Sequence, residues 1–263
     1  MGPDGVGISF TVRGSGHPVV LLHGTALSGA IWRGLGYTRA LEHHFRVVTV
    51  DLRGHGRSDK PVVAEAYRRE ALVDDVLAVL DTLRLSAAHV VGYSLGGSVG
   101  FSLLARAPER VSSLVSFAGP FASPLGSVGQ VIVPDYDDAL VAGGMAELVL
   151  RWEKVRGVDF DPATRHALHA NAADSMRALL AAIDEDPGLR TETVAALDSP
   201  TLFVAGHRDR LGLLAASQVA AALPGAKVRI LAGRDHTELL RPAPQVLRIL
   251  LPFLRANTPA SDG

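Results

Sequence analysis

Short runs of consecutive apolar residues alternate along the chain with longer stretches of helical periodicity. We predict strands at residues 8–13, 19–22, 46–51, 88–92, 111–117, 201–205 and 227–231. Several of these runs are apolar at nearly every position, as expected for strands that helices cover on both faces. Strands that alternate with helices predict βαβ units around a mostly parallel sheet, and therefore an α/β fold.

The predicted helices alternate with strands along most of the chain, but not between residues 120 and 199. Helices that alternate with strands are predicted at residues 28–43, 69–84, 95–106, 213–223 and 244–255. Between Gly119-Pro120 and Ser199-Pro200 no strong strand follows, only helix-like segments at residues 139–154, 162–173 and 175–184. We therefore expect a core of residues 1–119 and 200–263, with residues 120–199 inserted as a helical cap.

Composition narrows the class of protein. Hydrophobic residues make up 48% of the 263 positions and charged residues 20%, which supplies apolar surface for a large core. The formal net charge is −1, so we expect no nucleic-acid partner. No apolar run approaches 18 residues and the N-terminus lacks the blocks of a signal peptide, so we expect no membrane partner and a cytoplasmic location. A monomer and a homodimer both remain open.

One segment predicts a nucleophile. The predicted strand at residues 88–92 runs directly into Gly92-Tyr93-Ser94-Leu95-Gly96, and a predicted helix follows. A serine held in a strained turn between strand and helix needs small residues two positions before and after it, so that strand and helix can cross closely. Gly92 and Gly96 meet this demand, and Ser94 is the candidate nucleophile.

The Gly-x-Ser-x-Gly pattern alone is weak, because it also matches Gly96-Gly97-Ser98-Val99-Gly100. Ser98 would lie about one turn inside the helix, where we expect its hydroxyl to point along a packed helix face. The strand-turn-helix context therefore selects Ser94.

A serine hydroxyl attacks efficiently only when a base takes its proton and a third group orients that base. His236 follows the last predicted strand, and Asp209 follows the strand before it. Both strands end at the same edge of the predicted sheet, which is the ligand-binding edge of open α/β sheets. We predict His236 as the general base and Asp209 as the acid that orients it.

Several other side chains could take these roles. His207 would lie on the loop of the acid and is expected to face solvent, while His166 and His169 belong to the cap. Asp235 adjoins the candidate base, but neighbouring side chains on a loop seldom face one another, so Asp209 is preferred. The strand at residues 111–117 is followed by Ala-Gly-Pro and supplies no carboxylate.

Attack on a carbonyl creates an oxyanion that fixed hydrogen-bond donors must meet. The N–H of Leu95, at the start of a helix, is one candidate donor. The loop after the strand at residues 19–22 reads His23-Gly24-Thr25-Ala26, and we predict the N–H of Thr25 as the second. His23 is expected to hydrogen-bond within that loop.

Taken together, these segments resemble the α/β-hydrolase superfamily, and in particular its small lid-bearing esterases, enol-lactonases and cofactor-free haloperoxidases. The resemblance rests on His23-Gly24, residues 51–59 (DLRGHGRSD), residues 92–97, residues 107–111 (APERV), Gly206-His207-Arg208-Asp209 and His236. It implies an α/β-hydrolase fold, a triad of Ser94, Asp209 and His236, and Thr25 and Leu95 as oxyanion donors.

The sequence departs from the family at two points. Asp235 stands where the family usually has Gly before the histidine, and the first strand of the family is shortened or missing. Residues 51–59, including His55, are interpreted as a structural turn beside the elbow.

The nucleophile narrows the reaction. Haloalkane dehalogenases and epoxide hydrolases that resemble this layout use aspartate at the elbow, whereas serine indicates acyl transfer. We expect hydrolysis of a small-molecule carboxylic ester or lactone, without metal or cofactor. Carbon–carbon bond hydrolysis or perhydrolysis by the same residues, and a ligand-sensing signalling role, remain alternatives. Apolar substrate contacts are predicted from Phe121, Met145, Trp152 and Trp32.

Overall fold

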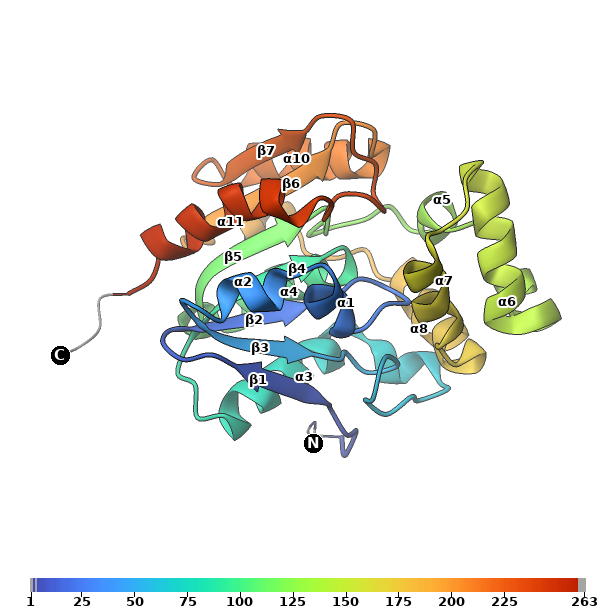
Figure 1. Ribbon diagram of the computed structural model, residues 1–263, viewed down its shortest axis with the longest axis horizontal. Helices are drawn as coiled ribbons and strands as arrows, with labels where there is room; N and C mark the ends of the chain where they lie inside the picture. The colour runs from blue at the N-terminus through green and yellow to red at the C-terminus, as the bar shows by residue number, and fades with distance from the viewer. Residues whose placement is uncertain (1, 3, 260–263) are drawn as a thin grey trace.

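The computed structural model describes residue 2 and residues 4–259, and its centre is a seven-stranded sheet (Figure 1). The strands are β1 (Phe10–Arg13), β2 (Pro18–Leu22), β3 (Arg46–Val50), β4 (Ala88–Tyr93), β5 (Val111–Phe117), β6 (Thr201–Gly206) and β7 (Lys227–Leu231). Their spatial order is β1-β3-β2-β4-β5-β6-β7. Only β1 runs antiparallel to its neighbour, so the predicted mostly parallel sheet is confirmed.

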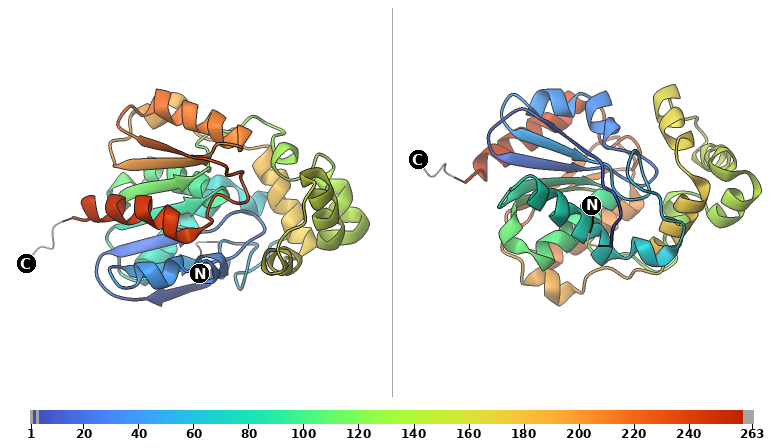
Figure 2. Two further views of the ribbon diagram at one scale, coloured as in Figure 1. Left: turned by 45° about the horizontal axis from the view of Figure 1, so that its top comes forward. Right: turned by 90° about the horizontal axis from the view of Figure 1, so that it is seen from below.

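Helices cover both faces of this sheet (Figure 2). The apolar cluster on one face draws on the helices α1 (Ala30–Gly34), α2 (Tyr37–Leu41) and α11 (Ala243–Ala256). The cluster on the other face draws on α3 (Arg69–Thr82), α4 (Leu95–Arg106) and α10 (Arg210–Ala222). Both faces are therefore shielded from water, which is why the central strands are apolar at consecutive positions.

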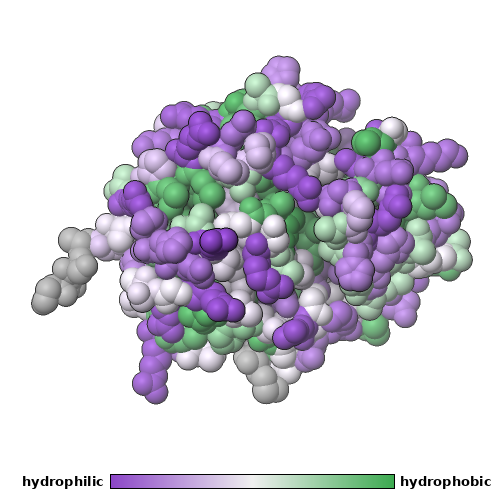
Figure 3. All heavy atoms as spheres, in the orientation of Figure 1, coloured by the Kyte–Doolittle hydropathy of each residue, from purple (hydrophilic) through white to green (hydrophobic). Residues whose placement is uncertain are grey.

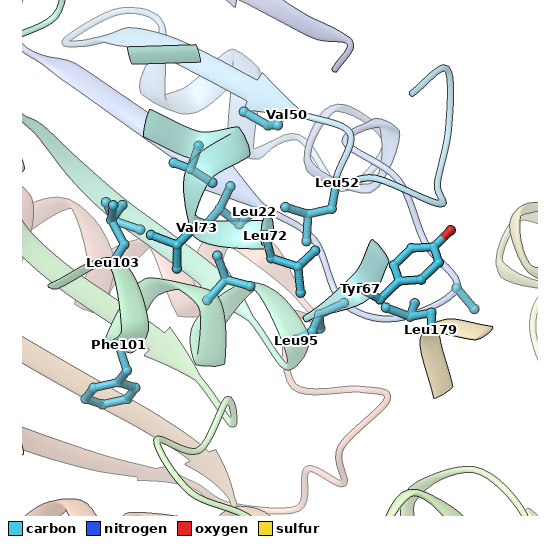
Figure 4. Packing of buried hydrophobic residues seen from close by; sticks show 14 of the residues in the cluster. Leu22, Val50, Leu52, Tyr67, Leu72, Val73, Leu95, Phe101, Leu103 and Leu179 are labelled. Atoms are coloured by element: carbon cyan, nitrogen blue, oxygen red, sulfur yellow. The ribbon is translucent and has the colours of Figure 1, made fainter. Parts of the chain in front are cut away.

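The strand side chains show this two-sided burial directly. Val20 and Leu22 of β2 belong to the cluster under α3 and α4, while Val19 and Leu21 belong to the opposite cluster, and all four are fully buried. Successive strand residues point to opposite faces, so one strand serves both clusters. Figure 4 shows part of the first cluster, in which Leu22 and Leu72 lie near one another and Tyr67 lies beside Leu179.

Five helices lie between β5 and β6 in the chain, and the first four of them, α5 to α8, form an insertion. The five helices are α5 (Val128–Val131), α6 (Tyr136–Arg156), α7 (Pro162–His169), α8 (Ala173–Asp184) and α9 (Thr191–Ala195). In Figures 1 and 2, α5 to α8 lie together beyond one edge of the sheet domain. The outgoing and returning chains meet at an antiparallel bridge between Ala122 and Gly188, where the Leu189 N–H also donates to the Phe121 carbonyl at 2.7 Å. We call the segment beyond this neck the helical insertion.

Two glycine-containing segments interrupt helices that the sequence pattern predicts as continuous. The predicted helix at residues 28–43 is divided into α1 and α2, because Gly36 adopts a positive φ of 87°. Within α6, Gly143 and Gly144 leave helical geometry and bend the helix. Short α5 and α9 were not predicted, since four or five residues carry too little periodicity to be recognised.

Within the described residues, none of the helices combines the length and hydrophobicity that crossing a membrane requires.

Candidate active site

Ser94 lies in a strained turn between β4 and α4. Its φ of 51° and ψ of −116° place a non-glycine residue in a sparsely populated region. The turn is possible because a Cβ on Gly92 would overlap the Gly96 carbonyl, and a Cβ on Gly96 would overlap the Leu22 carbonyl. The Ser94 N–H donates to the Phe117 carbonyl at 2.8 Å, which ties the turn to β5. The requirement for small residues at both glycine positions therefore has a direct steric cause.

The three residues of the predicted triad form one hydrogen-bonded row. His236 Nε2 lies 3.0 Å from Ser94 Oγ, and His236 Nδ1 lies 2.8 Å from Asp209 Oδ2. The carboxylate can only accept, so Nδ1 carries the hydrogen and Nε2 is left free to accept from the serine hydroxyl. The row has the geometry required for proton transfer from serine to imidazole.

Asp209 is held in place by the helix that follows it. As the N-cap residue of α10 it accepts a hydrogen bond from the Gly212 N–H at 2.8 Å, and its side chain is buried. Burial acts to raise the pKa of Asp209, but the hydrogen bond and charge of His236, together with the N–H groups of α10, outweigh it and lower the pKa below the usual value. Asp209 is thus kept ionised beside the imidazole.

Asp235 is hydrogen-bonded within the histidine loop and not to the imidazole. Its Oδ1 accepts from Thr237 Oγ1 and from the Glu238 N–H, both at 2.9 Å. The aspartate that replaces the family's usual glycine therefore closes a turn within the histidine loop. The carboxylate against His236 comes from Asp209, as the sequence argument preferred.

A tyrosine anchors the histidine loop from the elbow itself. Tyr93 Oη donates to the His236 carbonyl at 2.7 Å, and the two rings lie 5.6 Å apart. The side chain of Tyr93 is almost completely buried, so this bond is protected from water. Sequence reasoning did not assign Tyr93 a role, because the residue before the nucleophile is not specified by the elbow pattern.

The two predicted oxyanion donors lie beside the nucleophile. Thr25 and Leu95 line the same pocket as Ser94, and no acceptor among the described residues receives their backbone N–H groups. The Gly96 N–H donates to the His23 carbonyl at 3.1 Å and so fastens the Thr25 loop to the elbow. His23 hydrogen-bonds within its loop, as expected, through Nδ1 and the Gly24 carbonyl at 2.8 Å.

Ser98 differs from its expectation. It is half-buried and lines the pocket, because residues four apart on α4 share a helix face and Ser94 stands at the beginning of that face. No imidazole of the described residues is bonded to Ser98 Oγ, whereas Ser94 has His236. The Gly-x-Ser-x-Gly pattern therefore marks two serines that line the pocket, Ser94 and Ser98. Of these, Ser94 has an imidazole within hydrogen-bonding distance of its hydroxyl.

The pocket lies between the sheet domain and the helical insertion. Its cavity volume is roughly 180 Å³, and most of its lining is aliphatic. Figure 3 shows apolar surface on the sheet domain where it faces the insertion. Two ion pairs join core and insertion at this pocket: Arg69 with Asp186 at 2.6 Å, and Arg241 with Asp161 at 3.1 Å. Arg69, Asp186 and Arg241 are charged residues within the otherwise largely apolar lining.

Only one of the four predicted substrate contacts lines the pocket. Trp152 does so, whereas Phe121, Met145 and Trp32 are buried outside its lining. Trp32 packs edge-on against Tyr37 in the cluster under α11, with ring centroids 5.3 Å apart. Large apolar side chains are drawn into cores as readily as into pockets, and the sequence does not distinguish the two environments.

Comparison with known proteins agrees with this architecture. The family model of the alpha/beta hydrolase fold matches residues 17–164, more than half of the chain. The chain belongs to this family.

The similar proteins include enzymes of several kinds. The chain is 30% identical over 92% of its length to the dihydrolipoyllysine-residue acetyltransferase component of an acetoin cleaving system from Pseudomonas putida, of which it spans 64%. It is 31% identical over 78% of its length to the pimeloyl-(acyl-carrier protein) methyl ester esterase of Aeromonas hydrophila, of which it spans 82%. The crystal structure of the enol-lactonase from Burkholderia xenovorans LB400 has the same fold, with a TM-score of 0.79 at 24% identity, covering 96% of this chain and 98% of that one.

Proposed function

We propose that this protein is a serine hydrolase that cleaves a carboxylic ester or lactone of a small molecule through an acyl-enzyme. The observation that carries the proposal is the row in which His236 lies 3.0 Å from Ser94 Oγ and 2.8 Å from Asp209. A hydroxyl in a strained turn, a base that can accept its proton and an ionised carboxylate behind the base are the parts that acyl transfer needs.

In the proposed reaction, Ser94 Oγ attacks the carbonyl carbon while His236 Nε2 takes the hydroxyl proton. The oxyanion accepts from the N–H groups of Thr25 and Leu95. His236 then gives its proton to the departing alkoxide, which leaves Ser94 acylated. A water molecule attacks the acyl-enzyme as His236 takes its proton, and Ser94 departs with that proton restored. Asp209 stabilises the imidazolium formed in both halves.

The pocket favours a small substrate. At about 30 Å³ for each water molecule in the liquid, a cavity of roughly 180 Å³ has room for about six waters. The esterase and the lactonase named above support this substrate class. We propose residues 120–199 as the cap over this pocket, and residues 1–119 and 200–263 as the catalytic core.

The test is a panel of p-nitrophenyl esters and lactones, graded by acyl and alcohol size, with wild-type protein and Ser94→Ala. We expect turnover of the short members, and a loss of at least about 10⁴-fold in kcat for Ser94→Ala. A fluorophosphonate should label wild-type protein and Ser98→Ala on Ser94, and should not label Ser94→Ala. Full turnover by Ser94→Ala, or labelling on Ser98 instead, would refute the assignment.

A further inference from the structure

Ala26 directly follows the predicted oxyanion donor Thr25 and has an unusual backbone. Its φ is 59°, a left-handed conformation that costs a residue with a Cβ about 1–2 kcal/mol. The Leu27 N–H donates to the Gly24 carbonyl at 3.2 Å, so residues 24–27 form a turn with Ala26 as its third residue. A positive φ at that place normally selects glycine. An alanine stays there only where its surroundings hold it.

From the core side, His55 holds the Ala26 N–H. The amide donates to His55 Nε2 at 3.1 Å, and His55 Nδ1 lies 3.0 Å from the Arg53 carbonyl. The carbonyl can only accept, so Nδ1 carries the hydrogen and Nε2 is the acceptor. His55 is fully buried. The segment interpreted from sequence as a structural turn thus supports the oxyanion loop.

From the other side, the helical insertion holds the Ala26 carbonyl. Asn171 Nδ2 donates to it at 2.7 Å and also lies 3.0 Å from the Ala167 and Leu168 carbonyls at the end of α7. Three carbonyl oxygens surround this atom, so the amide nitrogen must face them, because the amide oxygen would be repelled. Asn171 therefore joins the end of an insertion helix to the oxyanion loop of the core.

We propose that Asn171 is a positioning residue for the oxyanion hole, an inference that rests on the proposed function. His55 and Asn171 fix the two peptide groups on either side of the Ala26 Cα, and so hold the turn that presents the Thr25 N–H. Without Asn171 the Ala26 carbonyl is free to rotate, and alanine relaxes toward negative φ. The Ser94, His236 and Asp209 row is untouched by this change, so the donor and not the base is lost.

This arrangement makes the oxyanion hole depend on the position of the insertion. The triad is built entirely from the sheet domain, whereas the turn that carries Thr25 is completed by a side chain from the insertion. Hydrolysis therefore requires the insertion to be seated on the core, even for a substrate too small to touch it.

The experiment compares Asn171→Ala and Asn171→Asp with wild type. Asn171→Asp keeps the size of the side chain but presents an acceptor to three carbonyls. The matched control is Arg165→Ala, which removes an ion pair of α7 with Glu153 at 2.8 Å, a contact that lies within the insertion. Each protein is assayed on an ester and on its thiono analogue, in which sulfur replaces the carbonyl oxygen. Sulfur is a weak acceptor, so the ratio of the two rates reports on the oxyanion hole.

Removal of one oxyanion donor costs about 10²–10³-fold in kcat. Because the Asn171 variants misalign one donor without deleting it, we expect about 10–100-fold lower kcat on the oxygen ester. KM should change by less than about threefold, and the shape of the pH profile should be unchanged, since the binding pocket and the base are intact. The oxygen-to-sulfur rate ratio should fall about tenfold in both variants and stay at the wild-type value in Arg165→Ala.

An unchanged rate ratio in Asn171→Asp would overturn the proposal, as would an equal fall of the ratio in Arg165→Ala. Amide hydrogen exchange gives a readout that needs no turnover: residues 24–27 should exchange faster in both Asn171 variants than in Arg165→Ala, and equal exchange would also overturn it. Failure of the proposed function is recognised separately, because Ser94→Ala would then retain wild-type turnover whatever the behaviour of Asn171.

Discussion

Asp209→Asn separates the chemical role of the buried carboxylate from its structural role. Asp209 accepts one hydrogen bond from His236 Nδ1 at 2.8 Å and one from the Gly212 N–H at 2.8 Å. In the variant, the side-chain oxygen still caps α10, since Asn is as good an N-cap as Asp. The side-chain NH₂ group then faces Nδ1, and the imidazole adopts the tautomer with its hydrogen on Nε2. In that form it cannot take the proton of Ser94.

The expected changes in kcat and in the free energy of unfolding follow from these two hydrogen bonds. The equivalent change in a serine protease triad lowers kcat about 10⁴-fold, which at about 1.4 kcal/mol for each factor of ten is about 5.5 kcal/mol of activation free energy. The free energy of unfolding should fall by only about 1 kcal/mol, because the cap is kept and only the interaction of the charge with the α10 dipole is lost. Asp209→Ala should match the loss of kcat and lose a further ~1 kcal/mol of stability with the cap.

The assay is steady-state hydrolysis of a short p-nitrophenyl ester, with denaturant unfolding of the same samples. Asp235→Asn is the control, because its carboxylate serves Thr237 and Glu238 and not the imidazole. We expect it to stay within about threefold of wild type, since Asn can still accept both bonds. If Asp209→Asn kept more than a tenth of wild-type kcat, or if Asp235→Asn were the inactive variant, the assignment of the acid would be wrong.

Three further perturbations test other parts of the site. Gly96→Ala forces a Cβ onto the Leu22 carbonyl, so we expect a loss of several kcal/mol in the free energy of unfolding and loss of activity, measured by thermal and denaturant unfolding beside the ester assay. Tyr93→Phe removes the bond to the His236 carbonyl and should lower stability by about 1 kcal/mol and kcat by about tenfold; unchanged kcat would contradict an anchoring role. Burial lowers the pKa of His55 in the folded protein to about 3, whereas in the unfolded chain the pKa is about 6.5. The unfolded chain therefore binds a proton at this position more readily, and the free energy of unfolding decreases as pH falls below about 6.5. This group alone should cost about 2 kcal/mol between pH 7 and pH 5, and His55→Gln should flatten the measured dependence of unfolding free energy on pH.

The sheet could be predicted from sequence because each strand carries its own signal. Runs such as Val19 to Leu22 are apolar on consecutive residues, and their burial on both faces is what the pattern predicts. The hydrogen-bonded row could also be predicted, since Ser94, Asp209 and His236 each follow a strand that ends at the same edge of the sheet. Local signals were enough because the sheet itself brings the strand ends together.

Contacts between the insertion and the core could not be predicted in this way. Asn171 lies 145 positions from Ala26, and no local pattern records that its amide reaches across. The same lack of local information explains why Phe121, Met145 and Trp32 were predicted as substrate contacts. Their apolar character predicts that they are buried, but not whether they are buried in the pocket or in the core. The sequence predicts that Ser98 lies on a packed helix face, but that face of α4 lines the pocket.

The neck at Ala122 and Gly188 has a consequence for how such proteins diversify. Since the chain leaves and re-enters the sheet domain at one paired point, a module of different length can be exchanged there while every strand keeps its neighbours. If Asn171 positions the oxyanion loop as proposed, a transplanted module would also have to bring a donor to the Ala26 carbonyl. Grafting a foreign module with and without an asparagine at that place, and measuring substrate preference and kcat for both grafts, would show whether the module can change the substrate without changing the rate of the reaction.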